Sequence, residues 1–291
     1  MLLTRHKNME TIKDEKIKEL KIKANNIRKS IVEMLYNAKS GHTAGALGMA
    51  DIFTYLYFEA LKHKPENPFW IERDRLVLSN GHICPVLYAS MAHSGYFKLD
   101  ELNTLRKFGS SLQGHPHREF LPMIETSSGP LGEGLSQAVG MALASKMENG
   151  IDRTIYCILG DGELNEGQNW EAIMLAAKYK LDNLIVIVDR NFIQIDGTTE
   201  EVMPLSVLED KWKSFNWDVQ KIDGHNFREI NHAIYHVKNI KWKPSVIIAN
   251  TIPGKGVKEW ENDYHWHGKA PNKKEYEMAI KELNILDEKL K

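Results

Sequence analysis

GDGELNEGQNWEAIMLAAKYKLDNLIVIVDRN, residues 160–191, is the stretch from which the fold class follows. An apolar segment precedes it, Thr154 to Leu159, and it contains an amphipathic run, Asn169 to Tyr179, and a second apolar segment, Leu184 to Val188. This order predicts a strand, a tight turn, a helix and a second strand, which together form one βαβ unit. The crossover in such a unit is almost always right-handed, so both strands end at the same edge of a parallel sheet.

Two polar residues follow the two strands of this unit. Asp161 comes after the first strand and Asn191 after the second, so we expect their side chains to converge at the carboxyl edge of the sheet, where open α/β proteins bind ligands. A carboxylate and an amide oxygen suit a hard cation that is also bound to phosphate oxygens. The glycines beside Asp161 let a diphosphate approach the backbone. An Asp between glycines is also ordinary turn chemistry, and it is the pairing with Asn191 that favours a ligand site.

Strands and helices alternate along the rest of the chain. Nearly all of the strands are apolar, which predicts an α/β fold with a parallel twisted sheet covered by helices on both faces. We expect one domain over residues 1–270, beginning with an N-terminal helix, and a charged helical tail over residues 271–291. The other predicted elements are a helix at Asp14–Ala38, a loop at Ser40–Gly48, a helix from Ala50, a strand at Leu76–Leu78, a small-residue helix ending at Asn149-Gly150, an irregular stretch after Val188, and a strand at Ser245–Asn250.

Composition excludes several classes of partner. The formal net charge is −1 over 291 residues, which provides no field for binding nucleic acid or an anionic membrane. No apolar run approaches the roughly 18 residues of a membrane span. The two cysteines, Cys84 and Cys157, have no second Cys or His at metal-binding spacing, which indicates a reducing compartment. We therefore expect a cytoplasmic protein that meets anionic ligands through local groups.

Several stretches resemble those of a known family. GDG followed by DRNFIQIDG resembles the thiamine diphosphate motif, and the match favours transketolases. The resemblance covers about Ala24 to Pro271 and implies that residues 1–270 form the diphosphate-binding domain of the thiamine diphosphate-binding fold. The supporting stretches are SGHTAGALGMADI, LSNGHICPVLYA, LQGHPHRE, SSGPLGEGLSQAVGMALA, and IPGKG followed by WHG.

The resemblance implies a ligand set for the cofactor and its metal. Thiamine diphosphate would be bound together with Mg²⁺ or Ca²⁺, and the ion would be held by Asp161, Asn191 and the carbonyl of Ile193. The other implied cofactor contacts are Gly162 at the diphosphate, the loop Gly129, Pro130 and Leu131 at the aminopyrimidine, and Ile195 near the cofactor rings.

The family's histidines match four positions of this chain. His82 and His267 would stand near the diphosphate and the reacting carbons, and His42 and His115 would contact hydroxyls or transferred protons of the sugar. A shift of two residues would nominate His265 in place of His267. Many full-length transketolases have Pro-Gly where Thr43-Ala44 follows His42 here, so the resemblance does not define the exact shape of this loop.

Two acidic residues also match the family pattern. Glu166, a catalytic candidate, and Glu171, a cofactor-binding candidate, correspond to residues at the interface between active sites. Both fall in the first turns of a helix, where the helix dipole favours acidic side chains without any function.

The implied reaction is transfer of a two-carbon ketol unit from a ketose phosphate to an aldose phosphate. The family's pyrimidine-binding half, which carries the glutamate that activates the cofactor, has no match here. We therefore expect a C-terminal partner subunit that supplies it, and assembly into a heterotetramer.

Two alternatives stay open. The chain could belong to another thiamine diphosphate enzyme, similar to deoxyxylulose-phosphate synthase or a two-chain 2-oxoacid dehydrogenase. It could also be a non-catalytic, diphosphate-binding regulatory subunit. GDGELNEGQNWEA and the GHP stretch favour transketolase, and the absence of G-x-G-x-x-G and of a P-loop Lys-Ser/Thr weighs against a nucleotide binder.

Overall fold

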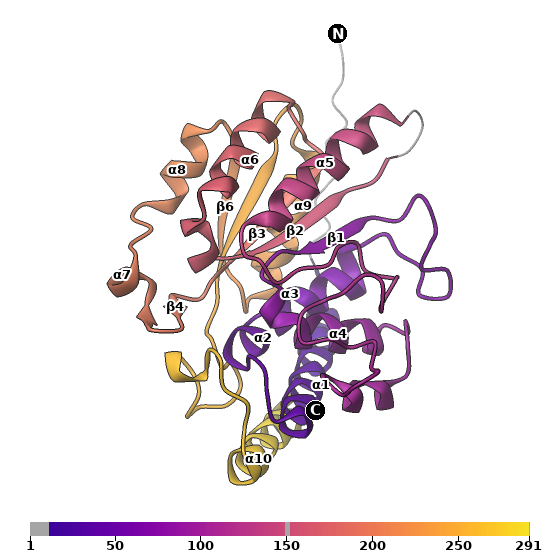
Figure 1. Ribbon diagram of the computed structural model, residues 1–291, viewed down its shortest axis with the longest axis vertical. Coiled ribbons are helices and arrows are strands. Elements are labelled where there is room, and N and C mark those ends of the chain that lie inside the picture. The colour runs from indigo at the N-terminus through magenta and orange to yellow at the C-terminus, as the bar shows by residue number, and fades with distance from the viewer. Residues whose placement is uncertain (1–11, 149–151, 291) are drawn as a thin grey trace.

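A parallel sheet forms the centre of the molecule (Figure 1). The computed structural model describes residues 12–148 and 152–290. In this part of the chain the sheet has five strands in the order β1-β2-β3-β7-β6, which confirms the predicted α/β fold. The predicted end of a helix at Asn149-Gly150 lies outside the described residues. The strands are β1 (Arg75–Leu78), β2 (Ile155–Gly160), β3 (Leu184–Arg190), β6 (Asp218–Asp223) and β7 (Ser245–Asn250).

Helices cover both faces of the sheet, because successive strand residues point to opposite sides. In β2, Tyr156 and Ile158 belong to one core, whereas Ile155, Cys157 and Leu159 belong to the other. The first core joins the sheet to α1 (Asp14–Ala38), α3 (Ala50–Tyr55), α4 (Cys84–His93) and α9 (Phe227–Asn239). The second core joins it to α5 (Glu133–Met147), α6 (Gly167–Lys178) and α8 (Leu208–Ser214), which Figure 1 shows on the near face.

Two predictions of irregular structure are wrong. The predicted loop at Ser40–Gly48 contains a short helix, α2 (Ala44–Gly48), all of whose residues are buried. Its packing overrides the low helix propensity of glycine. The stretch after Val188 contains β6 and α9. The polar sequence of β6, DVQKID, resembles a loop because β6 is an edge strand that is only partly buried.

A short hairpin extends from the end of β3. It pairs β4 (Ile193–Gln194) with β5 (Gly197–Thr198) in antiparallel fashion and leads into α7 (Thr199–Val202). Ile195 lies in the turn of this hairpin with 66% of its surface exposed. The hairpin therefore carries an apolar side chain out beyond the carboxyl edge of the sheet.

The last helix, α10 (Lys273–Leu290), packs against α1. Leu283 is fully buried, and its carbonyl accepts a hydrogen bond from Asn25 Nδ2 at 2.8 Å. Tyr276 stacks on Tyr36 with a centroid distance of 4.3 Å. This helix and the first one thus share a core. No helix within the described ranges combines the length and apolar character that crossing a membrane requires.

Candidate functional site

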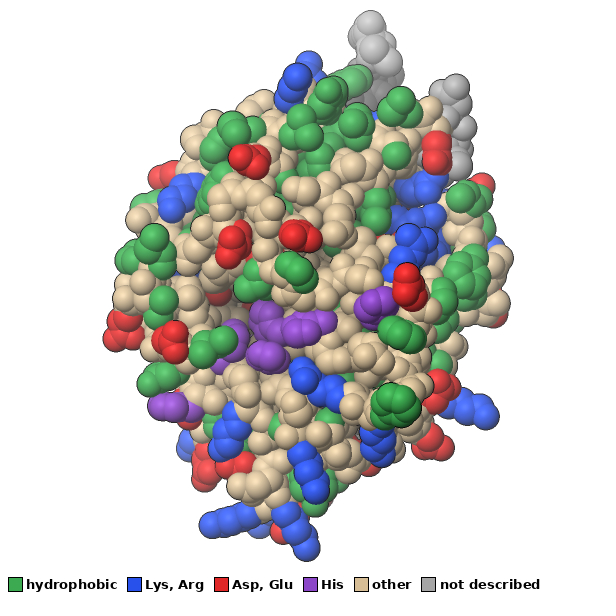
Figure 2. Space-filling model, viewed as in Figure 1, with side chains coloured by type: hydrophobic (Ala, Val, Ile, Leu, Met, Phe, Trp, Pro, Cys, Tyr) green, Lys and Arg blue, Asp and Glu red, His purple; other side chains and the backbone are tan. Residues whose placement is uncertain are grey.

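The carboxyl ends of β1, β2 and β3 open into a cavity of about 470 Å³. Asn80 follows β1, Asp161 follows β2 and Asn191 follows β3, and all three line the cavity. The chain leaves β1 towards α4 on one face of the sheet and leaves β2 towards α6 on the other. Strand ends that diverge in this way leave a crevice for a ligand. Figure 2 shows histidine side chains gathered at the middle of one face.

The carboxylate of Asp161 is tied to the loop after β3. Its Oδ2 accepts hydrogen bonds from the backbone N–H of Phe192 at 2.8 Å and from Arg190 Nη1 at 3.1 Å. Its Oδ1 accepts the N–H of Gly162 at 2.8 Å. Burial raises the pKa of Asp161 to about 6, although these hydrogen bonds and the charge of Arg190 oppose the shift.

Asn191 is oriented by a second buried carboxylate. Its Nδ2 donates to Asp189 Oδ2 at 2.9 Å, and its Oδ1 accepts the N–H of Ile193 at 3.1 Å. The hydroxyl of Thr251 donates to Oδ1 of Asp189. Burial, together with the nearby charge of Asp161, raises the pKa of Asp189 to about 7. The amide of Asn191 is therefore held in one orientation, with its oxygen towards the β4 hairpin.

The donor set fits a cation that arrives with its own oxygen ligands. Asp161, Asn191 and Ile193 line the same cavity, as the predicted metal site requires. Among the described residues, no group of three or more His, Cys, Asp or Glu side chains could hold a metal ion. One carboxylate, one amide and one carbonyl leave part of an octahedral shell open, which phosphate oxygens and water can complete.

Three histidine rings pack together in the cavity. The ring centroids of His42 and His82 are 5.0 Å apart, those of His42 and His267 are 5.6 Å apart, and those of His82 and His267 are 5.2 Å apart. Burial lowers the pKa of His42 to about 4 and also lowers the pKa values of His82 and His267. His115 lines the same cavity as a more exposed side chain, and its partial burial and the charge of Arg106 lower its pKa. These imidazoles are therefore neutral at pH 7.

The structure separates His265 from this group. Its side chain is 69% exposed, and its Nδ1 lies within hydrogen-bond distance, 2.7 Å, of Asp263 Oδ1, whereas His267 lines the cavity. The other predicted residues that line the cavity are Gly129, Leu131, Gly162, Glu166 and Ile195. Pro130 and Glu171 are exposed and do not line it.

A buried glutamate that the sequence did not indicate joins three segments of the site. Glu163 Oε1 accepts hydrogen bonds from Ser79 Oγ at 2.5 Å and from the N–H of Gly132 at 2.8 Å, and its Oε2 accepts the N–H of Gly160 at 3.0 Å. Burial raises its pKa. The side chain thus links the ends of β1 and β2 to the loop before α5. Asn80 was also missed, although it follows a strand just as Asp161 does.

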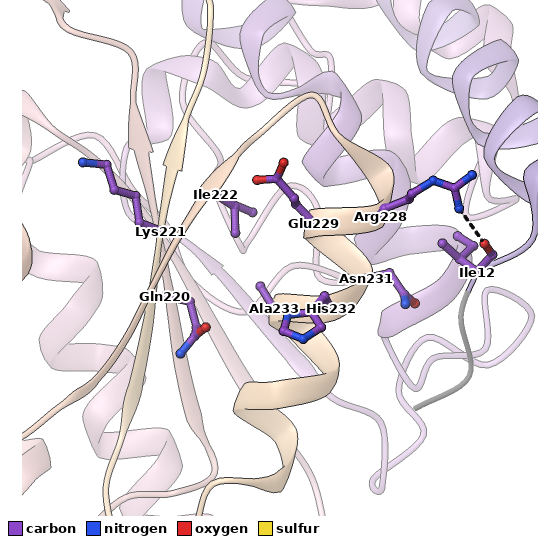
Figure 3. Close-up of a pocket in the computed structure, with 9 residues that line it drawn as sticks. All are labelled: Ile12, Gln220, Lys221, Ile222, Arg228, Glu229, Asn231, His232 and Ala233. Atoms are coloured by element: carbon purple, nitrogen blue, oxygen red, sulfur yellow. Dashed lines mark hydrogen bonds between the residues drawn. The ribbon is translucent and has the colours of Figure 1, made fainter. Parts of the chain in front are cut away.

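A second cavity, of about 340 Å³, lies between the edge strand β6 and α9 (Figure 3). Figure 3 shows Gln220 and Lys221 on the strand and His232 on the helix. Arg228 Nη1 donates to the carbonyl of Ile12 at 3.2 Å. None of the predicted site residues lines this cavity, so the candidate site is the cavity at the carboxyl edge.

The family model described as transketolase, thiamine diphosphate binding domain, matches residues 20–289. This chain belongs to the transketolase family. The match confirms the family predicted from the motifs and the thiamine diphosphate-binding character of the domain. It includes the residues that line the cavity and nearly all of α10.

Relatives of this transketolase-family chain fall into two length classes. It is 45% identical to the 6-deoxy-6-sulfo-D-fructose transketolase subunit SqwG of Clostridium sp. (strain MSTE9), over 91% of this chain and 96% of that one. It is 41% identical to an apulose-4-phosphate transketolase subunit of Phocaeicola vulgatus, over 94% and 97%. The transketolase crystal structure from Campylobacter jejuni superposes with a TM-score of 0.86 at 38% identity, covering 91% of this chain and 42% of that one. The chain therefore spans less than half the length of that transketolase.

Proposed function

We propose that this chain is the diphosphate-binding subunit of a two-chain transketolase that uses thiamine diphosphate and Mg²⁺ to transfer a two-carbon ketol unit. The observation that carries the proposal is the convergence of Asp161, Asn191 and three histidines in one cavity of a transketolase-family domain. The side-chain oxygens at the strand ends can bind a metal ion that carries a diphosphate. The neutral imidazoles beside them can accept protons from sugar hydroxyls.

Asp161, Asn191 and the carbonyl of Ile193 would hold the metal ion, with Ca²⁺ as a substitute for Mg²⁺. Gly162, which lines the cavity, would let the diphosphate approach the backbone because it has no side chain. Gly129, which lines the cavity at a φ of 147°, would lie beside the aminopyrimidine together with Leu131. These assignments are supported by the observation that all of these residues line the same cavity.

When bound, thiamine diphosphate supplies a carbon nucleophile and an electron sink for cleavage of the ketose carbon–carbon bond. The protein's own contribution would be to bind sugar hydroxyls and move their protons. His42, His82 and His267 suit this task because lowered pKa values keep them neutral and able to accept a proton. His115 and Glu166 line the cavity as exposed side chains, and we place them where sugar or a partner would make contact.

The partner would be a C-terminal subunit that carries the pyrimidine-binding domain and the activating glutamate, with two copies of each chain. Support comes from the two relatives that match over nearly their whole length, both of which are named as subunits. Leu131 and Ile195 line the cavity with 37% and 66% of their surfaces exposed. A covering chain would bury this apolar surface. We also propose a cytoplasmic site of action, consistent with two free cysteines among the described residues.

The donor would be a ketose with an anionic terminal group, and the acceptor an aldose phosphate. The two relatives act, by their names, on a sulfonated ketose and on a ketose phosphate. No Lys or Arg is among the described residues that line the cavity, so recognition of the anionic tail would fall partly to the partner subunit.

Copurification of the chain with its native partner provides the test. We expect calorimetry on the complex to show thiamine diphosphate uptake that requires Mg²⁺, and assays to show ketol transfer from ketose phosphates. Turnover of pyruvate instead would favour a synthase or 2-oxoacid dehydrogenase. A complex that takes up no thiamine diphosphate would overturn the proposal altogether.

A further inference from the structure

A buried amide without a partner lies in the wall of the cavity. Asn80 is 0% exposed, and within the described structure neither its Nδ2 nor its Oδ1 has a hydrogen-bond partner. Buried polar groups in native proteins are nearly always paired, and an unpaired one costs about 1–3 kcal/mol. Because the residue lines the cavity, a ligand in the cavity is the partner that this amide can reach.

The amide lies beside the turn that carries Asp161. A Cβ added to Gly160 would be 3.6 Å from the Cβ of Asn80 and 3.8 Å from its Nδ2. The ends of β1, β2 and β3 thus each contribute one polar side chain, namely Asn80, Asp161 and Asn191. The first of these stands next to the strand end where the diphosphate would lie.

The backbone on both sides of Asn80 is held firmly. Ser79 Oγ donates to Glu163 at 2.5 Å and accepts the N–H of Gly134 at 3.1 Å. The carbonyl of Asn80 accepts the N–H of Ile83 at 3.1 Å. A Cβ at Gly81 would lie 2.3 Å from Ser128 Oγ, so the following turn is also closely packed. The backbone that carries the amide is therefore preorganised, which reduces the entropy lost on binding.

The surrounding charges favour a donor at this position. Asp161, Glu163 and Asp189 line the same cavity, so an anionic ligand needs N–H groups to offset their repulsion. An amide supplies a donor without adding charge.

We propose that Asn80 binds the diphosphate of the cofactor, with Nδ2 donating to a phosphate oxygen. This inference rests on the proposed function, and it adds a contact at β1 to the residues implied by the family motifs.

Calorimetry on the chain with its partner, in the presence of Mg²⁺, tests the contact with two probes, thiamine diphosphate and inorganic pyrophosphate. We expect Asn80→Leu to weaken both ligands about tenfold, since hydrogen bonds to charged groups are among the stronger ones. Asn80→Asp should weaken them further through charge repulsion. The melting temperature of the ligand-free Asn80→Leu protein should not fall, because an unpaired amide is replaced by an apolar group of similar size. Asn80→Ala serves if the Leu variant fails to fold.

Asn183 provides a matched control. Its Nδ2 donates to the carbonyl of Ala142 at 3.0 Å and its Oδ1 is buried without a partner, but it precedes β3 at the opposite edge of the sheet. Asn183→Ala should lower the melting temperature and leave both dissociation constants unchanged. Undiminished binding by folded Asn80 variants would overturn the role of Asn80 alone. Failure of the wild-type complex to bind thiamine diphosphate would overturn the proposed function as well.

Discussion

The guanidinium of Arg190 and the carboxylate of Asp161 form a buried ion pair, with Nη1 3.1 Å from Oδ2. Arg190 also donates to Thr199 Oγ1 at 2.8 Å and to Glu200 at 2.6 Å, so its position is fixed independently of Asp161. The pair holds the acid at the strand end with Oδ2 engaged. This leaves Oδ1, which also accepts the N–H of Gly162, as the oxygen that we propose for the cation.

The first prediction concerns the charge of Asp161. Asp161→Asn keeps an acceptor for the N–H of Phe192 but removes the only carboxylate of the proposed metal site. Mg²⁺-dependent binding of thiamine diphosphate should weaken by about 100-fold or more, since loss of even an outer ligand contact costs about 10–100-fold. Calorimetry with and without Mg²⁺ measures the effect. Asp182→Asn, at the opposite edge of the sheet beside Lys146, is the control, and equal binding by both variants would contradict the metal assignment.

The second prediction concerns Glu163. In the wild-type protein, three donors share the two carboxylate oxygens of Glu163. Glutamine replaces one of these oxygens by an NH₂ group, so at least one buried donor loses its acceptor. Glu163→Gln should lower the free energy of unfolding by about 1–3 kcal/mol, and Glu163→Ala should lower it more. Urea unfolding measures this, with Glu133→Ala, exposed in the first turn of α5, as the control. If both Glu163 variants are as stable as the Glu133→Ala control, the link between β1, β2 and the loop before α5 is dispensable for stability.

The convergence of Asp161 and Asn191 could be predicted because it depends on a local rule. Parallel strands joined by one crossover must end at the same edge of the sheet, and the structure pairs Gly160 with Asp189 at adjacent strand ends. The strand at Ser245–Asn250 was predicted with its observed bounds because a run of apolar residues between turns suffices to define a buried strand.

The sequence alone does not distinguish the buried Glu163 from the exposed Glu166. Both are acidic residues close to the start of a helix, yet Glu163 is buried and Glu166 is exposed. The difference arises from Ser79 and Gly132, which approach Glu163 from distant parts of the chain. Burial that depends on such long-range packing leaves no local pattern.

The third prediction concerns the boundary proposed at residue 270. Leu283 on α10 is fully buried, so Leu283→Ala should lower the free energy of unfolding by about 2–5 kcal/mol if the helix belongs to the domain core. Ile285→Ala, at a side chain that is 43% exposed, should cost far less. Urea unfolding of both variants compares them. Near-equal, small losses would support a tail that is independent of the domain.

The last prediction concerns the pH dependence of stability through His42. Burial, with the charges of His267, Arg106 and His115, lowers its pKa in the folded protein from 6.5 to about 4. As pH falls through this window, the unfolded chain takes up a proton that the folded protein does not, so His42 makes folding less favourable. Glutamine at this position removes the effect.

The free energy of unfolding of His42→Gln should therefore rise relative to wild type as pH falls from about 6.5 to about 4, by at most about 3 kcal/mol at 1.36 kcal/mol per pKa unit. Asp161 and Asp189, whose pKa values are raised, make folding more favourable as pH falls. Because they do so in the wild type and in the variant alike, the difference in the free energy of unfolding between the two proteins isolates His42. Urea unfolding at several pH values measures the difference, and the proton resonances of the His42 ring should titrate near pH 4. A difference that stays constant across this window would mean that His42 is not held neutral by burial.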